Sequence, residues 1–221
     1  MKRVALIFAF IVAGCGSQFG DQRAEINPAD FVLLPCGLQK EAPPCALAGF
    51  GGKRLLFGAP AGLSSTLTED NLRQLDGVFL FSLRASDIEG LDEVRNASWR
   101  AGRDRALPVS GPQGIGDVVA GLNLAFETAD ALRIVDEGVP KGGFDAALLV
   151  EMERRDETPD IVFDTGDVVI RAMQRADQKT RYSIVYRDAA PFVIETCRVD
   201  DCSFGDGLEW PLSAQHFIVN N

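Results

Sequence analysis

Short apolar runs alternate with helical stretches along most of the chain, and this alternation limits its fold more than any other feature. Residues 77–83 are largely apolar, as expected of a strand that is covered on both faces. After them, Val118, Val119, Leu122 and Phe126 recur at helical spacing within a predicted helix at 117–127. A second helical stretch is predicted at 67–74, and further strands at 30–34, 54–57, 107–110, 146–151, 161–163, 168–173, 182–186 and 192–194. The pattern predicts one α/β domain over residues 30–221.

Composition excludes several classes of function. The 32 acidic and 22 basic side chains give a net charge of −10, so the sequence predicts no nucleic-acid partner, because that needs a concentrated positive surface. His216 is the single histidine, and imidazole is the usual general base and metal ligand. A Ser-His-Asp triad would therefore have to use His216, and the G-x-S-x-G motif is absent. A hydrolase that uses paired carboxylates stays open.

The first fifteen residues have the pattern of an export signal. Lys2 and Arg3 precede an apolar run at 4–13, and Val-Ala-Gly-Cys closes it at 12–15. This segment resembles the lipobox of bacterial lipoproteins, which implies a signal peptide at 1–14, a lipidated Cys15 and a membrane anchor. In that family an Asp after the cysteine retains the protein at the inner membrane. Gly16 therefore favours an outer membrane lipoprotein whose domain faces the periplasm.

The alternatives to a lipoprotein leader are a transmembrane helix and a simple cleaved signal peptide. The apolar run is shorter than the ~20 residues that a transmembrane helix needs. A simple cleaved signal peptide remains the other possibility, in which Cys15 would be removed or left as a free thiol. Residues 15–29 are mostly small and polar and predict a lipid-anchored flexible tether.

Four cysteines remain beyond Cys15, an even number in a chain expected to enter an oxidising compartment. Three pairings are possible, and we favour the local disulfides Cys36–Cys45 and Cys197–Cys202. A four-cysteine zinc site is the alternative, although the two pairs do not both show zinc-knuckle spacing.

A glycine-rich turn at 111–116 lies between a predicted strand and a predicted helix. Backbone N–H groups at such a turn can hold a phosphate. The third glycine of the dinucleotide motif is missing and no Lys-Ser or Lys-Thr pair follows. Backbone geometry is therefore the simpler explanation for these glycines.

Four segments together resemble the metallo-β-lactamase superfamily, in particular its ribonuclease Z and arylsulfatase branch. GGKRLLFGAPAG at 51–62 is similar to that family's GG-K-R-LLFDAGPG strand and turn, and LDGVFL at 75–80 to its LDAVFLTH strand. LPVSGPQG at 107–114 and VFDTGDV at 162–168 resemble its LPVYGPPG and VFDNGDV segments. The resemblance covers about residues 31–196 and implies a four-layer αβ/βα sandwich.

The family's metal motif, T-H-x-H-x-D-H, has no counterpart in this chain. The trailing Ile88, Gly90 and Leu91 match the family's HIGGL and set the register. Ser82, Arg84, Ser86 and Asp87 then occupy the ligand positions. Because an arginine brings a positive charge and no lone pair, it is a poor neighbour for a metal ion.

The family's remaining ligand positions are also altered. Asp177 lies near a further histidine position, Glu195 lies near an aspartate position, and Gly58 replaces an aspartate. His216 is read as an ordinary histidine, although the family often has a last ligand near there. Three carboxylates, those of Asp87, Asp177 and Glu195, could still hold calcium or magnesium if they converge. We expect instead that Arg84 pairs with Asp87 and fills the former metal pocket.

The resemblance and the missing ligands together predict a pseudoenzyme with no cofactor, no catalytic residue and no metal. It would act as a scaffold or binding module at the cell envelope, with an unknown envelope protein as partner. A homodimer is possible, because active relatives are often dimers. Two other functions stay open: a phosphoester or sulfate-ester hydrolase with an oxygen-ligated metal, and a lipoprotein that binds an anionic small ligand through Arg84.

Overall fold

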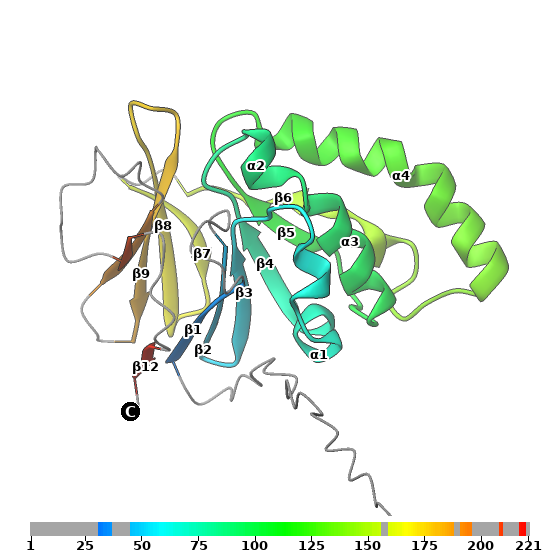
Figure 1. Ribbon diagram of the computed structural model, residues 1–221, viewed down its shortest axis with the longest axis horizontal. Coiled ribbons are helices and arrows are strands. Elements are labelled where there is room, and N and C mark those ends of the chain that lie inside the picture. Colours follow the sequence, from blue (N-terminus) through cyan, green and yellow to red (C-terminus); the bar gives the residue numbers. More distant parts are fainter. Residues whose placement is uncertain are drawn as a thin grey trace, which may run out of the picture.

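Two β-sheets face each other, and helices cover the outer side of the larger sheet (Figure 1). The computed structural model describes residues 31–36, 45–155, 159–187, 191–195, 208–209 and 217–219. The expected signal peptide, Cys15, the tether, Cys197, Cys202 and His216 lie outside these residues.

The larger sheet has seven strands in the order β12-β1-β2-β3-β4-β5-β6. Their bounds are Phe217–Val219, Phe31–Pro35, Ala46–Phe50, Lys53–Phe57, Leu75–Phe79, Leu107–Ser110 and Leu149–Glu151. Pairing is antiparallel from β12 to β3 and parallel from β3 to β6. Gly51 and Gly52 join β2 to β3 with positive φ angles at both positions, as a two-residue hairpin turn of this hand requires.

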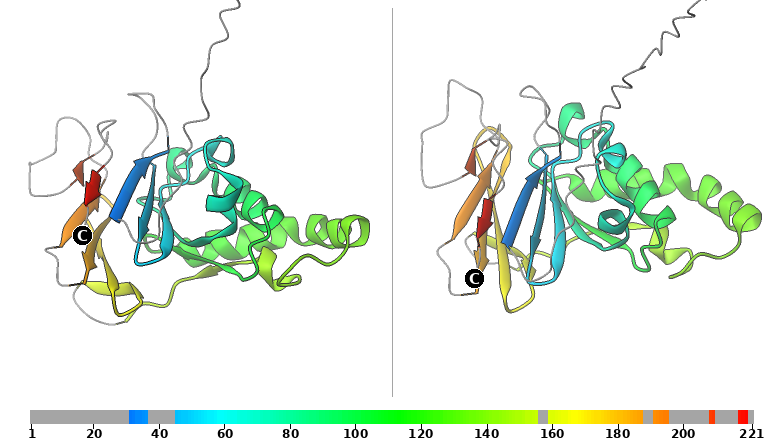
Figure 2. Two further views of the ribbon diagram at one scale, coloured as in Figure 1. Left: turned by 90° about the horizontal axis from the view of Figure 1, so that it is seen from below. Right: turned by 60° about the horizontal axis from the view of Figure 1, so that its bottom comes forward.

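The helices lie in the connections of the larger sheet, on the side away from the second sheet (Figures 1 and 2). They are α1 Glu69–Arg73, α2 Ala85–Ile88, α3 Leu91–Arg100 and α4 Ile115–Glu137, with short 3-10 turns η1 Leu63–Ser65 and η2 Asp145–Ala147. The helix predicted at 117–127 therefore runs ten residues further, because nothing breaks it before Gly138, where φ is +89°. Among the described helices, none is long and apolar enough to cross a membrane.

The second sheet has five strands in the order β11-β10-β9-β8-β7. Their bounds are Leu208–Glu209, Phe192–Glu195, Thr180–Tyr186, Val168–Gln174 and Asp160–Asp164. Alternate residues of β9 are buried against the larger sheet, so one face is inward. The α/β sandwich is confirmed. Of its four expected layers the described residues form three, since no described helix lies on the outer face of this sheet (Figure 1).

The two faces of the larger sheet build two separate hydrophobic cores. On β3, Leu56 packs into the core beneath the helices, whereas Leu55 and Phe57 pack into the core between the sheets. Phe79 of β4 stacks on Phe57 at 4.9 Å between ring centroids and meets Tyr182 edge-on at 5.3 Å. These aromatic contacts join the two sheets.

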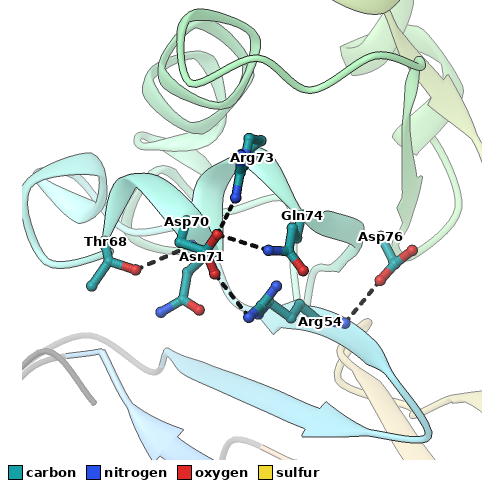
Figure 3. Close-up of polar contacts among 7 residues, drawn as sticks. All are labelled: Arg54, Thr68, Asp70, Asn71, Arg73, Gln74 and Asp76. Atoms are coloured by element: carbon teal, nitrogen blue, oxygen red, sulfur yellow. Dashed lines mark hydrogen bonds and ion pairs between the residues drawn. The ribbon is translucent and has the colours of Figure 1, made fainter. Parts of the chain in front are cut away.

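Polar contacts fix α1 to the amino-terminal ends of β3 and β4 (Figure 3). The buried guanidinium of Arg54 pairs with Asp70 at 2.9 Å. The backbone N–H of Arg54 donates to Asp76 Oδ2, also at 2.9 Å. The Thr68 hydroxyl caps the helix by accepting from the Asn71 N–H at 3.1 Å. Hydrogen bonds from Arg73 are the main cause of the lowered pKa of Asp70. This network therefore links α1 to β3, and β3 to β4, at the amino-terminal ends of these strands.

The Cys36–Cys45 disulfide is present, with a Cα–Cα distance of 5.3 Å. It joins the end of β1 to the start of β2, and the Cys36 N–H also donates to the Cys45 carbonyl at 3.0 Å. The favoured local pairing is thus found at this site, and the bond closes the loop between two neighbouring antiparallel strands.

Candidate functional site

The candidate site lies where β3, β4 and β5 end, because the turns after these strands meet at one edge of the sheet. The Gly58 N–H donates to the Phe79 carbonyl at 2.8 Å, and the Leu80 N–H donates to the Ser110 carbonyl at 2.8 Å. The three strand ends are therefore in register, and they hold the segment 80–90 that carries the family's ligand positions.

Close backbone packing fixes the segment 80–90 over the turn at 58–62. The Ala59 N–H donates to the Asp87 carbonyl at 3.1 Å, and the Gly90 N–H donates to the Ala59 carbonyl at 2.8 Å. A Cβ atom at Gly90 would lie 2.0 Å from the Pro60 carbonyl oxygen, so only glycine fits. This requirement explains the glycine of the Ile88-Glu-Gly90-Leu91 match on which the register of the ligand positions depends.

A hydrogen-bonded pair occupies two of the four ligand positions. The Ser82 hydroxyl donates to Asp87 Oδ2 in a short contact, and the Ser86 hydroxyl donates to Asp87 Oδ1 at 3.4 Å. The Arg84 N–H in turn donates to the Ser82 oxygen at 3.1 Å. Ser82 is 4% exposed and Asp87 6% exposed. The carboxylate is thus buried but has hydroxyl partners on both oxygens.

Arg84 does not form the expected ion pair. Its side chain is exposed, and it makes no hydrogen bond or ion pair with any described residue. Asp87 already receives hydroxyl donors from its own turn, and burying a guanidinium beside it would cost desolvation free energy. The predicted Arg84–Asp87 ion pair was therefore wrong, and Ser82 is the hydrogen-bond partner of Asp87.

Asp177 lies on a different segment, in the turn between β8 and β9. Its side chain is exposed, accepts from the Lys179 N–H at 3.2 Å and lies 3.6 Å from the Arg175 guanidinium. Among the residues whose side chains the structure describes, no three His, Cys, Asp or Glu side chains gather as metal ligands. The Glu195 side chain lies outside the described part. Asp87 and Asp177 thus contribute to no described carboxylate cluster.

The second sheet contributes Tyr182 and Thr180, which sequence reasoning did not single out. The fully buried Tyr182 hydroxyl donates to the Leu80 carbonyl at 2.9 Å, and the Thr180 N–H donates to the Phe81 carbonyl at 2.7 Å. Burial raises the pKa of the Tyr182 phenol well above its usual value of 10.0, so the hydroxyl stays a donor. Both contacts fix the strand-to-loop junction directly before Ser82.

The glycine turn before α4 is explained by backbone geometry. Gly114 has φ +96°, which favours glycine, and α4 begins at the next residue. A Cβ at Gly114 would lie 3.3 Å from Leu83, and a Cβ at Gly111 would lie 3.0 Å from the buried Ile115 side chain. Apolar side chains therefore lie close to both glycines, and this packing, together with the positive φ of Gly114, explains why glycine occupies these positions.

Three solved structures are similar to this chain. YhfI of Bacillus subtilis, described as a metallo-β-lactamase fold protein, has a TM-score of 0.52 at 13% identity, covering 77% of this chain and 65% of its own. The short form of human tRNase Z has a TM-score of 0.49 at 15% identity, covering 75% and 68%. A mutant Cronobacter sakazakii metallo-β-lactamase has a TM-score of 0.47 at 11% identity, covering 75% and 59%.

The similarity to YhfI shows that the chain has the metallo-β-lactamase fold, as its sequence resemblance implied. The chain covers between 59% and 68% of the length of these three solved structures. No family model matches the chain, and no curated protein does. At these identities the similarity shows the fold alone, and the function has to be argued from the site.

Proposed function

We propose that this chain is a metal-independent binding or scaffold protein built on the metallo-β-lactamase fold. The observation that carries this proposal is the Ser82–Asp87 hydrogen bond, which joins two former ligand positions to each other. A bound cation would have to displace the Ser82 proton from Asp87 and recruit further ligands. Neither Ser82 nor Arg84 offers the nitrogen ligands that a zinc centre of this family uses.

The hydrolase with an oxygen-ligated metal is supported less well. It needs several carboxylates around one cation, and Asp177 belongs instead to an exposed turn with Arg175 beside it. The binding of an anionic ligand through Arg84 keeps one supporting observation, since this exposed guanidinium is unpaired among the described residues. We therefore retain it as the second candidate function.

A hydrolysis assay separates the binding protein from the hydrolase. The purified chain would be incubated with bis(p-nitrophenyl) phosphate and with p-nitrophenyl sulfate, each with zinc, manganese, calcium or magnesium. We expect release of p-nitrophenol at the rate of an Asp87→Asn control, which keeps the shape of the side chain and removes its charge. Metal-dependent turnover that the Asp87→Asn chain loses would refute the proposal.

We also propose that the protein is anchored in the bacterial outer membrane through Cys15, with the domain in the periplasm and an envelope protein as its partner. The lipobox-like sequence before Cys15 supports this location. Cys15→Ser is expected to abolish the incorporation of labelled palmitate into the chain, because no acyl chain could then be attached. Labelling that Cys15→Ser leaves unchanged would contradict lipidation at Cys15.

A further inference from the structure

Arginine side chains gather between α3 and α4, away from the Ser82–Asp87 site. Arg95 is fully buried and binds Asp130 through both terminal nitrogens, one of them at 3.2 Å. Arg103 is 1% exposed and donates to the Ser98 hydroxyl at 3.0 Å and to the Arg105 carbonyl. Arg133 lies over the Trp99 ring at 4.3 Å from its centroid.

The charges of this group do not balance. It has four guanidinium groups, those of Arg95, Arg100, Arg103 and Arg133, and three carboxylates act on them, those of Asp104, Asp130 and Glu137. Each carboxylate already has a partner: Asp130 is used by Arg95, Glu137 is paired with Arg133 at 2.9 Å, and Asp104 is paired with Lys141 at 2.7 Å. The pKa of Arg103 falls to about 10, first through burial and then through the nearby charge of Arg95. The cluster therefore carries an excess of positive charge in a protein whose net charge is −10.

The hydrogen-bond donors of this region also exceed its acceptors. Within the described part of the chain, Arg95 Nε, Trp99 Nε1 and Arg103 Nη2 are buried N–H groups without an acceptor. Arg100 makes no side-chain hydrogen bond or ion pair with a described residue. Asn96 uses its carbonyl oxygen to accept from Arg95 at 2.9 Å, so its amide N–H groups remain. The three buried N–H groups are covered by protein atoms, whereas Arg100 and the Asn96 amide line a cavity in which an oxyanion would accept from both.

A cavity lies at the surface of this cluster. Its volume is about 120 Å³, and it is lined by Asn96, Trp99, Arg100, Phe126, Ala129, Asp130 and Arg133. The volume suits a small ion better than a drug-sized ligand, whose pockets are ≈ 300–1,000 Å³. Trp99 and Phe126 provide aromatic walls, while Arg100 and Arg133 provide guanidinium groups. The Asp130 carboxylate also lines the cavity, but it is paired with Arg95, so Arg100 and Arg133 leave the small cavity with positive charge.

We propose that the cavity between α3 and α4 is a binding site for a small oxyanion such as phosphate, sulfate or a carboxylate. Arg100 and Arg133 hold the anion from two helices, with the Asn96 amide as a neutral donor. The anion supplies the hydrogen-bond acceptor and the negative charge that Arg100 lacks. This site is independent of the proposed function, because it does not involve Ser82, Arg84 or Asp87.

Tryptophan fluorescence can test this site directly. The chain has two tryptophans, Trp99 and Trp210, so a Trp210→Phe chain reports Trp99 alone. Phosphate, sulfate and acetate would each be added to this chain at constant ionic strength, with chloride as the reference anion. We expect a saturable change in Trp99 emission with at least one oxyanion and none with chloride. Comparison of the three titrations shows which oxyanion binds most tightly.

Two variants locate the binding site, and one serves as a matched control. Arg100→Gln and Arg133→Gln are each expected to weaken binding at least tenfold, because each removes a charged donor. Arg155→Gln removes an exposed arginine that pairs with Asp164 outside the cavity lining, and should leave the affinity unchanged. A thermal melt of each chain confirms folding. No saturable response to any oxyanion, or a response that both Arg100→Gln and Arg133→Gln leave unchanged, would overturn the proposal. A response that Arg84→Gln alone removes would also overturn it and would support the second candidate function instead.

Discussion

Replacing Asp130 with alanine is expected to lower the free energy of unfolding by about 3–5 kcal/mol, as breaking a buried ion pair from one side does. Arg95 is fully buried and Asp130 is 3% exposed, so the change leaves a guanidinium without its counter-charge inside the protein. Arg103, whose charge is close by, makes the loss worse. Urea unfolding followed by circular dichroism measures the change.

Asp136 provides the control for this prediction on the same helix. Its side chain is exposed and forms no ion pair with a described residue, so Asp136→Ala should change the free energy of unfolding by less than about 0.5 kcal/mol. Equal effects of the two substitutions would show that the Arg95–Asp130 pair does not stabilise the contact between α3 and α4.

Phe79→Ala is expected to destabilise the protein by about 3–5 kcal/mol, the usual cost of removing a large buried aromatic side chain. Phe79 is fully buried and contacts Phe57, Phe163 and Tyr182, so its loss opens a cavity between the two sheets. The same unfolding measurement serves here. Phe144→Ala removes the same atoms from a side chain that is 37% exposed, and its effect should be several times smaller. A Phe79→Ala effect below about 1 kcal/mol would contradict the assignment of the core between the sheets.

Patterns that depend on one strand or turn could be predicted from the sequence. The strand predicted at 107–110 agrees with β5 at both ends. Gly90 set the register of the family's ligand positions, and its close packing against Pro60, which only glycine allows, supports that register. Strand β2 was missed because its sequence, ALAGF, is rich in small residues of low strand propensity. Its place comes from pairing with β1 and β3, which a local pattern does not contain.

Side-chain partners were harder to predict than backbone elements. Charge alone favoured an Arg84–Asp87 pair, but the Ser82 hydroxyl reaches Asp87 within the same turn. The pairing of Arg95 with Asp130 joins residues 35 positions apart, and many other acidic residues were available to Arg95 in the sequence. Such pairings depend on which side chains become buried together when α3 packs against α4, and a short sequence motif does not contain this information.

The metal content of the purified chain tests the central claim most directly. The protein would be prepared without chelator, offered zinc, manganese, calcium and magnesium in turn, freed of unbound ions and analysed by elemental mass spectrometry beside an Asp87→Asn control. Because Asp87 is hydrogen-bonded to Ser82 and Ser86, we expect far less than one equivalent of every metal in both chains. Near-stoichiometric binding of any one metal that Asp87→Asn abolishes would contradict the account and restore the hydrolase as the leading function.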